Sequence, residues 1–155
     1  LYFLTKSNNL NSEDDIRNNF ITCAAIETHF AWDRYKNKNK GADDQLKSGT
    51  IPDEFKRQMF YTFSDYRNIF FGTDISSCQN IKNASENIKI ILNKEKDEEK
   101  NEKQMINKWT NSYGPEIWEG MLCALPHNEN FKDKEEYTTS PEDFAKKPQF
   151  LRWYI

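Results

Sequence analysis

The chain has 155 residues, of which 36% are apolar, 30% are charged and 14% are aromatic, and its formal net charge is −3. This length suffices for one domain with a hydrophobic core, and the many aromatic rings exclude a disordered chain. The weak negative charge excludes a general attraction to nucleic acid or to anionic membranes, and no apolar run approaches the roughly 20 residues that span a bilayer.

The first predicted helix runs from about Glu13 to Lys36. Ser12 is a suitable N-cap, and the acidic residues that follow it favour the positive end of a helix. Apolar residues at helical spacing predict its buried face: Ile16, Phe20, Cys23 and Phe30. Glu27 falls within that face. The polar segment 36–52, which contains two glycines and ends in proline, is predicted to be a loop.

A second helix is predicted to begin near Asp53 and to end at Gly72, because glycine favours the conformation that ends helices. It contains the aromatic run "FYTFSDYRNIFFGTD". The large side chains recur at steps of three and four, which predicts one buried stripe of Phe55, Met59, Phe63, Tyr66 and Phe70, widened by Phe60 and Phe71. We interpret these rings as core, because the rings of a ligand platform would more often break the period.

Two charged residues border the predicted core. Glu27 lies in the apolar face of the first helix, and Arg67 lies beside the stripe of the second. An unpaired buried charge costs several kcal/mol, so each of them needs a partner. We therefore predict that Glu27 and Arg67 pair across the two packed helices.

The sequence of the middle of the chain predicts two further helices. One runs from Asn80 to Leu92, with its inward residues at Ile81, Ile88, Ile91 and Leu92. The mixed charges of "NKEKDEEKNEK" then predict an exposed turn or a connector. A helix that begins around this segment carries Met105, Ile106 and Trp109.

The last third of the chain is also predicted to be helical. "YGPEIWEGMLCAL" has a proline at a first-turn position, a mid-helix Gly120 that suits close helix packing, and five apolar anchors: Ile117, Trp118, Met121, Leu122 and Leu125. The stretch from Pro126 to Thr139 is predicted to be a polar loop. Ser140 then caps a short helix, and a last helix follows Pro148. With no period-two strand pattern, the predicted fold class is all-α, a helical bundle.

Patterns for catalysis or metal binding are sparse. His29 and Asp33 lie four residues apart on a helix, but two ligands do not make a metal site. Cys23 and His29 lie six apart and face different ways, which argues against a Cys–His nucleophile. There is no glycine-rich phosphate loop and no GxSxG motif. We therefore expect no enzyme activity, no metal and no cofactor.

One local group of basic residues spans the end of the first helix, the following segment and the start of the second helix: Arg34, Lys36, Lys38, Lys40, Lys47, Lys56 and Arg57. Converging cations bind sulfate or sialic acid groups, so these residues are the candidate receptor-binding site. Five acidic residues interleave with them: Asp33, Asp43, Asp44, Asp53 and Glu54. An ordinary surface of mixed charge is the alternative interpretation.

The three cysteines are Cys23, Cys78 and Cys123, and no two of them form a CxxC pair. In a surface protein this odd number leaves a free thiol or a bond to a partner beyond the chain. Three buried thiols of a cytosolic protein are the alternative, and the spacing leaves both interpretations open. The chain lacks a secretory signal at its start, and its apolar ends predict that it is a piece of a longer protein.

Four motifs occur in a familiar order: "CAAIETHFAWDRYK", "GTIPDEFKRQMFYTFSDYRNIFFGTDI", "IWEGMLCAL" and "PEDFAKKPQFLRWY". They resemble segments of the Duffy-binding-like domain, the adhesion module of the Plasmodium erythrocyte membrane protein 1 variant antigens and of related erythrocyte-invasion ligands. The second motif is most similar to domains of the placental, chondroitin-sulfate-binding variant. The resemblance implies a helical fold of three subdomains, with residues 1–139 as the middle bundle and residues 140–155 as the start of the third.

The resemblance also implies a function. It predicts an extracellular adhesion module, part of a larger membrane-anchored protein on the infected erythrocyte, that binds a host receptor (a glycosaminoglycan or a protein), contacts neighbouring domains and binds no nucleic acid. The alternative is a structural, antigenically variable spacer without a receptor of its own. Cys123 is similar to a family disulfide cysteine whose partner lies beyond the chain, and Cys23 and Cys78 are a candidate pair.

Overall fold

The computed structural model describes residues 12–74, 79–93 and 96–152, and none of these residues lies in a β-strand. The predicted all-α class is confirmed. The helices are α2 (Glu13–Lys38), α3 (Ala42–Lys47), α4 (Asp53–Phe71), α5 (Gln79–Leu92), α6 (Glu98–Lys108), the π-helical turn η1 (Trp109–Tyr113), α7 (Gly114–Cys123), the 3-10 turn η2 (Asn128–Asn130), α8 (Glu135–Thr138), α9 (Glu142–Ala145) and α10 (Gln149–Arg152).

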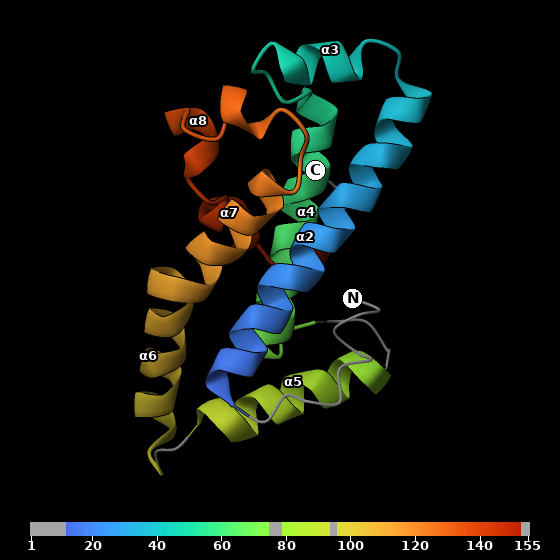
Figure 1. The fold of residues 1–155 in the computed structure, drawn as a ribbon. Coiled ribbons are helices and arrows are strands. Elements are labelled where there is room, and N and C mark those ends of the chain that lie inside the picture. The colour runs from blue at the N-terminus through green and yellow to red at the C-terminus, as the bar shows by residue number, and fades with distance from the viewer. Residues whose placement is uncertain (1–11, 75–78, 94–95, 153–155) are drawn as a thin grey trace.

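The centre of the bundle is formed by α2, α4 and α7. Helix α2 packs against both α4 and α7, and α4 also contacts α5 and α9. Figure 1 shows α2 and α4 running in opposite directions, with α3 across one end of the bundle and α5 across the other. Helix α6 continues through η1 into α7, so the two form one bent column beside α2. Among the described residues, no helix combines the length and the hydropathy needed to cross a membrane.

Helix α2 begins as predicted. The Ser12 hydroxyl accepts a hydrogen bond from the backbone N–H of Asp15 at 3.2 Å, and the helix extends two residues past its predicted end. The prediction that Phe30 is buried is wrong, because half of its surface is exposed (50%). In the second half of α2 the buried face rotates to Thr28 and Trp32, and the Trp32 ring packs edge-on against Phe55 of α4.

The aromatic stripe of α4 is core, as predicted. Its five residues are each 2% exposed or less, and the helix ends where Gly72 adopts a left-handed conformation. The Phe63 ring contacts the rings of Trp109 and Trp118. The rings of η1 and α7 therefore close over α4, and edge-on and tilted ring pairs fill the centre of the core among aliphatic side chains.

The predicted pair of Glu27 and Arg67 is wrong, because the structure gives each a different partner. The Tyr66 hydroxyl donates to Glu27 Oε1 at 3.0 Å, and Arg67 Nε donates to Glu142 Oε1 at 2.8 Å. Successive helical residues point about 100° apart, so Tyr66 faces α2 while Arg67 faces α9. Burial raises the pKa of Tyr66 above its ordinary value, which keeps its hydroxyl protonated and able to donate.

Glu142 also accepts a second hydrogen bond. Its Oε2 atom lies 2.8 Å from the indole Nε1 of Trp109, which donates to it. The Arg67 guanidinium also lies over the ring of Phe71, 4.7 Å from its centre. One carboxylate thus joins α9 to both α4 and η1. We call the three residues Arg67, Trp109 and Glu142 the Glu142 clamp.

The middle segment forms the two predicted helices, α5 and α6. In α5, Ile81, Ile88 and Leu92 are buried as predicted, and Ile91 is partly buried. The second predicted helix forms as α6, in which Ile106 is 49% exposed. The buried face of this column passes through Met105 of α6 and Trp109 at the start of η1, four residues apart.

The five apolar anchors of α7 are buried, as predicted. A Cβ atom at Gly120 would lie 3.0 Å from the Cγ2 atom of Ile21, which confirms the close approach of α7 and α2. The Trp118 indole donates to the backbone oxygen of Tyr137 at 2.6 Å. This bond holds α8 against α7.

Two expectations for irregular segments and one for a helix cap need correction. The segment 36–52 contains the short helix α3, whose apolar residues Ala42 and Leu46 are buried. The predicted loop from Pro126 to Thr139 contains η2, α8 and two buried rings, those of Phe131 and Tyr137. In each segment, burial against the rest of the fold orders a chain that sequence polarity predicted to be irregular. Pro141 rather than Ser140 occupies the N-cap position of α9, without a side-chain cap.

Candidate functional site

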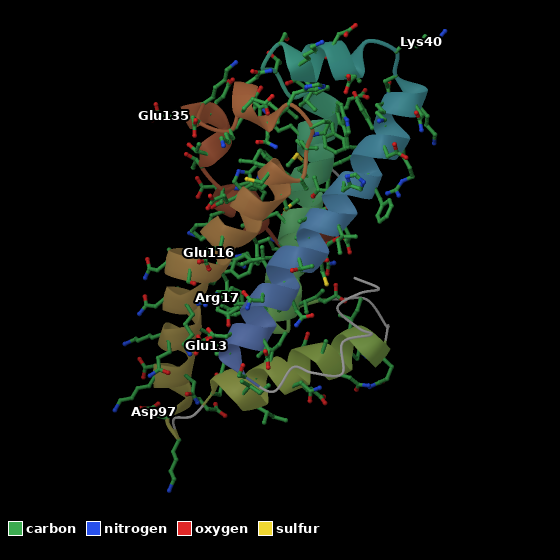
Figure 2. The ribbon with its side chains drawn as sticks, viewed as in Figure 1. Glu13, Arg17, Lys40, Asp97, Glu116 and Glu135 are labelled. Atoms are coloured by element: carbon green, nitrogen blue, oxygen red, sulfur yellow. The ribbon has the colours of Figure 1, made fainter. Side chains whose placement is uncertain are left out.

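The seven predicted cations lie at the end of the bundle that carries α3. We call them the basic rim: Arg34, Lys36 and Lys38 in α2, Lys40 in the following turn, Lys47 in α3, and Lys56 and Arg57 in the first turns of α4. All are exposed except Lys56, which is partly buried. In Figure 2, Lys40 extends away from the bundle at its outermost corner.

A small pocket brings two cations of the rim together. It has a volume of about 250 Å³ and lies between α2 and α4, with Arg34 and Lys38 among its α2 residues and Glu54 and Gln58 on the α4 side. Arg34 and Lys38 are four residues apart, which places them on one face of the helix. Burial, and then the nearby charge of Glu54, raises the pKa of Tyr35 in the same wall. The pocket offers two converging cations opposed by one carboxylate.

Most of the rim cations are not neutralised. Lys36 Nζ lies 3.5 Å from Asp33 Oδ1, and this is the one ion pair of the rim among the described residues. Arg57 lies over the ring of Tyr61, 5.9 Å from its centre. One of the acidic residues between these cations contacts a histidine outside the rim, since Asp43 Oδ2 lies 3.4 Å from His127 Nε2. The acidic residues therefore dilute the positive charge of the rim without pairing with each cation.

The connection from α3 to α4 is fixed by residues far away in the sequence. Asn130 Nδ2 donates to the backbone oxygen of Lys47 at 2.7 Å, and Lys134 Nζ donates to that of Gly49 at 2.6 Å. The hydroxyl of Tyr137 accepts from the backbone N–H of Ile51 at 3.0 Å. These bonds hold the rim in one shape against η2 and α8.

Two glycines of this segment provide a matched test of that attachment. Gly41 and Gly49 both have left-handed backbone angles, φ of +88° and +95°. Gly41→Ala is expected to lower the free energy of unfolding by about 1 kcal/mol, the cost of an L-residue in that conformation. Gly49→Ala is expected to cost about 2 kcal/mol, because a Cβ there would also lie 2.8 Å from the backbone oxygen of Asn130. Urea unfolding of both variants checks this, and equal losses would contradict the close contact.

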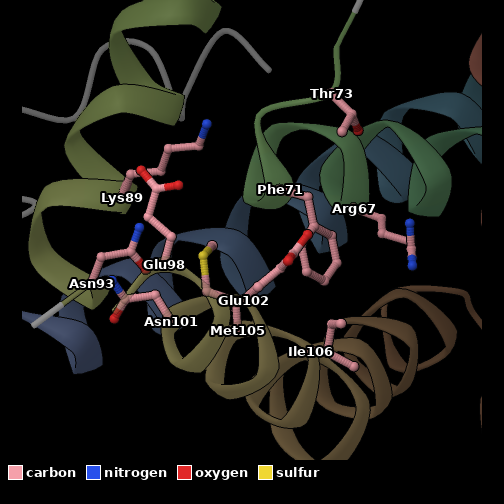
Figure 3. Close-up of a pocket in the computed structure, with 10 residues that line it drawn as sticks. All are labelled: Arg67, Phe71, Thr73, Lys89, Asn93, Glu98, Asn101, Glu102, Met105 and Ile106. Atoms are coloured by element: carbon pink, nitrogen blue, oxygen red, sulfur yellow. The ribbon is translucent and has the colours of Figure 1, made fainter. Parts of the chain in front are cut away.

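A second concave surface lies at the opposite end of the bundle, where sequence reasoning predicted no site. We call it the α4–α6 cleft; it has a volume of about 580 Å³ and lies between the end of α4, the end of α5 and the start of α6. Figure 3 shows the residues that line it, which include Arg67, Phe71, Lys89, Glu98, Glu102 and Met105. The sequence signals this cleft only through the four-residue spacing of Glu98 and Glu102 in the charged run "NKEKDEEKNEK".

An apolar hollow is the third feature of the surface. It has a volume of about 450 Å³ and is lined by Ala25, Ile26, His29, Phe30 and Ala124. The ring of His29 contacts that of Phe30 edge-on, with 5.3 Å between their centres. Sequence reasoning missed this hollow because it placed Phe30 in the core.

The cysteines and the metal ligands can be placed within the described residues. Cys23 and Cys123 are free thiols, the first buried and the second exposed. Burial raises the pKa of the Cys23 thiol. Cys78, the partner that the resemblance implies for Cys23, lies outside the described residues. Residues 12–74, 79–93 and 96–152 contain no group of three or more His, Cys, Asp and Glu placed to hold a metal ion.

The fold and its surfaces define an all-helical domain whose polar exterior, rather than a catalytic centre, carries the candidate sites. A model of the Duffy binding domain family matches residues 1–152, so the chain belongs to that family. Domains of this family are extracellular adhesion modules that bind host cell-surface receptors. No curated protein and no solved structure matches the chain.

Proposed function

We propose that this domain binds a sulfated glycosaminoglycan such as chondroitin sulfate through the basic rim. The domain would act as part of a membrane-anchored variant antigen on the infected erythrocyte. The observation that supports the proposal best is the arrangement of the rim, in which six exposed cations and one partly buried cation come from three consecutive helices and one turn. Family membership supports adhesion but names no receptor.

The chemistry of the rim suits a chain of sulfate groups. A sulfated glycan offers anionic groups at intervals, and several cations along one surface can bind them together. Arg34 and Lys38 converge on the small pocket and would hold one sulfate, while Lys36 and Lys40 would contact its neighbours along the glycan. Exposed charges are screened within about 8 Å at physiological ionic strength, so the binding is expected to weaken steeply with salt.

Charge reversal of the rim is the direct test. The triple variant Lys36→Glu, Lys38→Glu, Lys40→Glu is expected to lose most of its retention on a chondroitin sulfate column. The matched control is Lys82→Glu, Lys100→Glu, Lys103→Glu, which makes the same change in net charge on exposed lysines of α5 and α6. The control should elute close to the unmodified domain. Equal losses in the two triple variants would mean that net charge, and not the rim, governs retention.

A spacer between neighbouring domains is the second candidate function, and the apolar hollow around Phe30 favours it. Apolar surface of this kind is suited to contact with another domain of the same polypeptide. This function predicts association with a neighbouring domain that is insensitive to salt, together with no retention on chondroitin sulfate. Measuring both interactions at two salt concentrations distinguishes the two candidates.

A further inference from the structure

The short helix α3 depends on its surroundings for its order and its position. It has six residues (Ala42–Lys47), and an isolated helix of fewer than about 12 residues is only marginally stable in water. Burial of Ala42 and Leu46 fixes one face of this helix. Lys40 lies in the turn just before α3, and Lys47 lies at its end. The places of two rim cations are therefore set by the contacts that hold α3.

Three side chains that follow α7 hold the connection from α3 to α4. We call Asn130, Lys134 and Tyr137 the brace. Its hydrogen bonds reach the backbone of every second residue of the connection, namely Lys47 at 2.7 Å, Gly49 at 2.6 Å and Ile51 at 3.0 Å. The partners lie 83, 85 and 86 positions apart in the sequence. Because all three bonds are made to main-chain atoms, the brace fixes the path of the chain itself.

The brace is in turn anchored in the core. Tyr137 is 3% exposed, its ring contacts that of Phe131 edge-on, and its backbone oxygen accepts the indole N–H of Trp118 at 2.6 Å. Ile51, which donates to the hydroxyl of Tyr137, is 1% exposed. Figure 1 shows α3 and α8 at the same end of the bundle. A continuous series of contacts thus runs from α7 through Tyr137 to the residues that join α3 to α4.

We propose that Tyr137 and Lys134 are positioning residues of the basic rim. They hold the connection between α3 and α4 in one shape, so that Lys40 and Lys47 stay in register with the cations of α2 and α4 before a glycan arrives. A surface that is already ordered binds more tightly, because less conformational freedom is lost on binding. The inference rests on the proposed binding of a sulfated glycan, and it assigns control of that binding to residues that need not touch the glycan.

Two tyrosine variants of the 155-residue chain test the proposal without changing any charge. Tyr137→Phe keeps the ring and removes the acceptor of the Ile51 N–H. It is expected to bind chondroitin sulfate about fivefold more weakly, because the glycan must then order the connection. Tyr113→Phe is the matched control, since it also removes one hydrogen bond of a buried tyrosine, to the backbone oxygen of Glu13 at the far end of α2. This control should bind as the unmodified domain does.

Two further measurements separate positioning from a general loss of structure. The amides of Ser48, Gly49 and Thr50 are bonded within α3 and its connection. Their hydrogen exchange should become faster in Tyr137→Phe and stay unchanged in Tyr113→Phe. The dependence of glycan binding on salt should stay the same in both variants, because the number of cations is unchanged.

Lysine variants test the second positioning residue. Lys134→Met and Lys132→Met remove the same charge from exposed lysines two residues apart, but only Lys134 donates to Gly49. Lys134→Met is expected to weaken glycan binding several-fold more than Lys132→Met, and Lys134→Arg, which keeps a charged donor, should restore most of the loss. A weaker salt dependence in Lys134→Met than in Lys132→Met would mean that Lys134 itself binds the glycan, which contradicts a positioning role.

The outcomes distinguish this inference from the glycan proposal. If the unmodified domain does not bind chondroitin sulfate, the glycan proposal fails and the positioning role fails with it. If the unmodified domain binds, but Tyr137→Phe binds as well as Tyr113→Phe or exchanges the amides of residues 48–50 no faster, only the positioning role is overturned. Equal binding by Lys134→Met and Lys132→Met overturns it for Lys134.

Discussion

Replacing Phe70 by alanine is expected to lower the free energy of unfolding by about 4 kcal/mol. The side chain is fully buried, and its ring lies 4.8 Å from the centre of the Tyr113 ring and 5.3 Å from that of Trp109. It also contacts the ring of Phe20 edge-on. Removing it leaves a cavity where α2, α4 and η1 meet, and the large neighbouring rings cannot easily collapse into that space. Urea denaturation of the variant measures the loss.

Phe30→Ala is the matched control for this prediction, because it removes the same side chain from a half-exposed position on α2. The expected loss is below about 1 kcal/mol, since little buried surface is involved. A similar loss in both variants would show that the interior does not depend on the stripe of α4. A loss confined to Phe70→Ala would support a core that is built from rings.

Glu142→Ala is expected to destabilise the domain by about 3 kcal/mol. The substitution leaves Arg67 without its ion pair and the indole N–H of Trp109 without its acceptor. Breaking a buried ion pair costs about 3–5 kcal/mol; this pair is partly exposed, at 19% and 23%, which reduces that share, and the lost indole bond adds to it. Thermal and urea unfolding measure the change.

Two further variants test whether the Glu142 clamp is responsible. Glu142→Gln keeps one acceptor oxygen and removes the charge, so its loss should fall between those of the alanine variant and the unmodified domain. Glu119→Ala removes an exposed glutamate of α7 and is expected to change stability by less than about 0.5 kcal/mol. Equal effects of Glu142→Ala and Glu119→Ala would rule out a stabilising role for the clamp.

The central helices could be predicted from the sequence because their signals are local. Ser12 marks the start of α2, Gly72 marks the end of α4, and the stripe between Phe55 and Phe70 repeats at the helical period. Each of these signals involves residues within a few turns of one another. Caps and periodicity are the properties that a single helix imposes on its own sequence.

The errors arise where a distant contact decides the outcome. Arg67 pairs with a residue 75 positions away, and Tyr137 is buried because its hydroxyl meets Ile51, 86 positions away. Phe30 lies on the predicted face of α2, but the partner helix turns the buried face toward Trp32. Polarity alone predicts a loop or a buried face correctly only when no such partner overrides it.

The candidate sites divide in the same way. The basic rim could be predicted because all seven of its cations lie within 24 consecutive residues, from Arg34 to Arg57, on elements that follow one another. The α4–α6 cleft could not be predicted, because three helices contribute to it. The boundary between residues 139 and 140 stays a prediction.

The Glu142 clamp has a mechanical consequence. A pulling force on the carboxyl-terminal segment would be transmitted to α4, because the ion pair between Glu142 and Arg67 joins α9 directly to that helix. Helix α4 is a rigid rod of about 28 Å, and its far end carries Lys56 and Arg57. Tension applied after α9 would therefore travel along α4 to the cations of the rim, at the other end of the bundle from the carboxylate of Glu142.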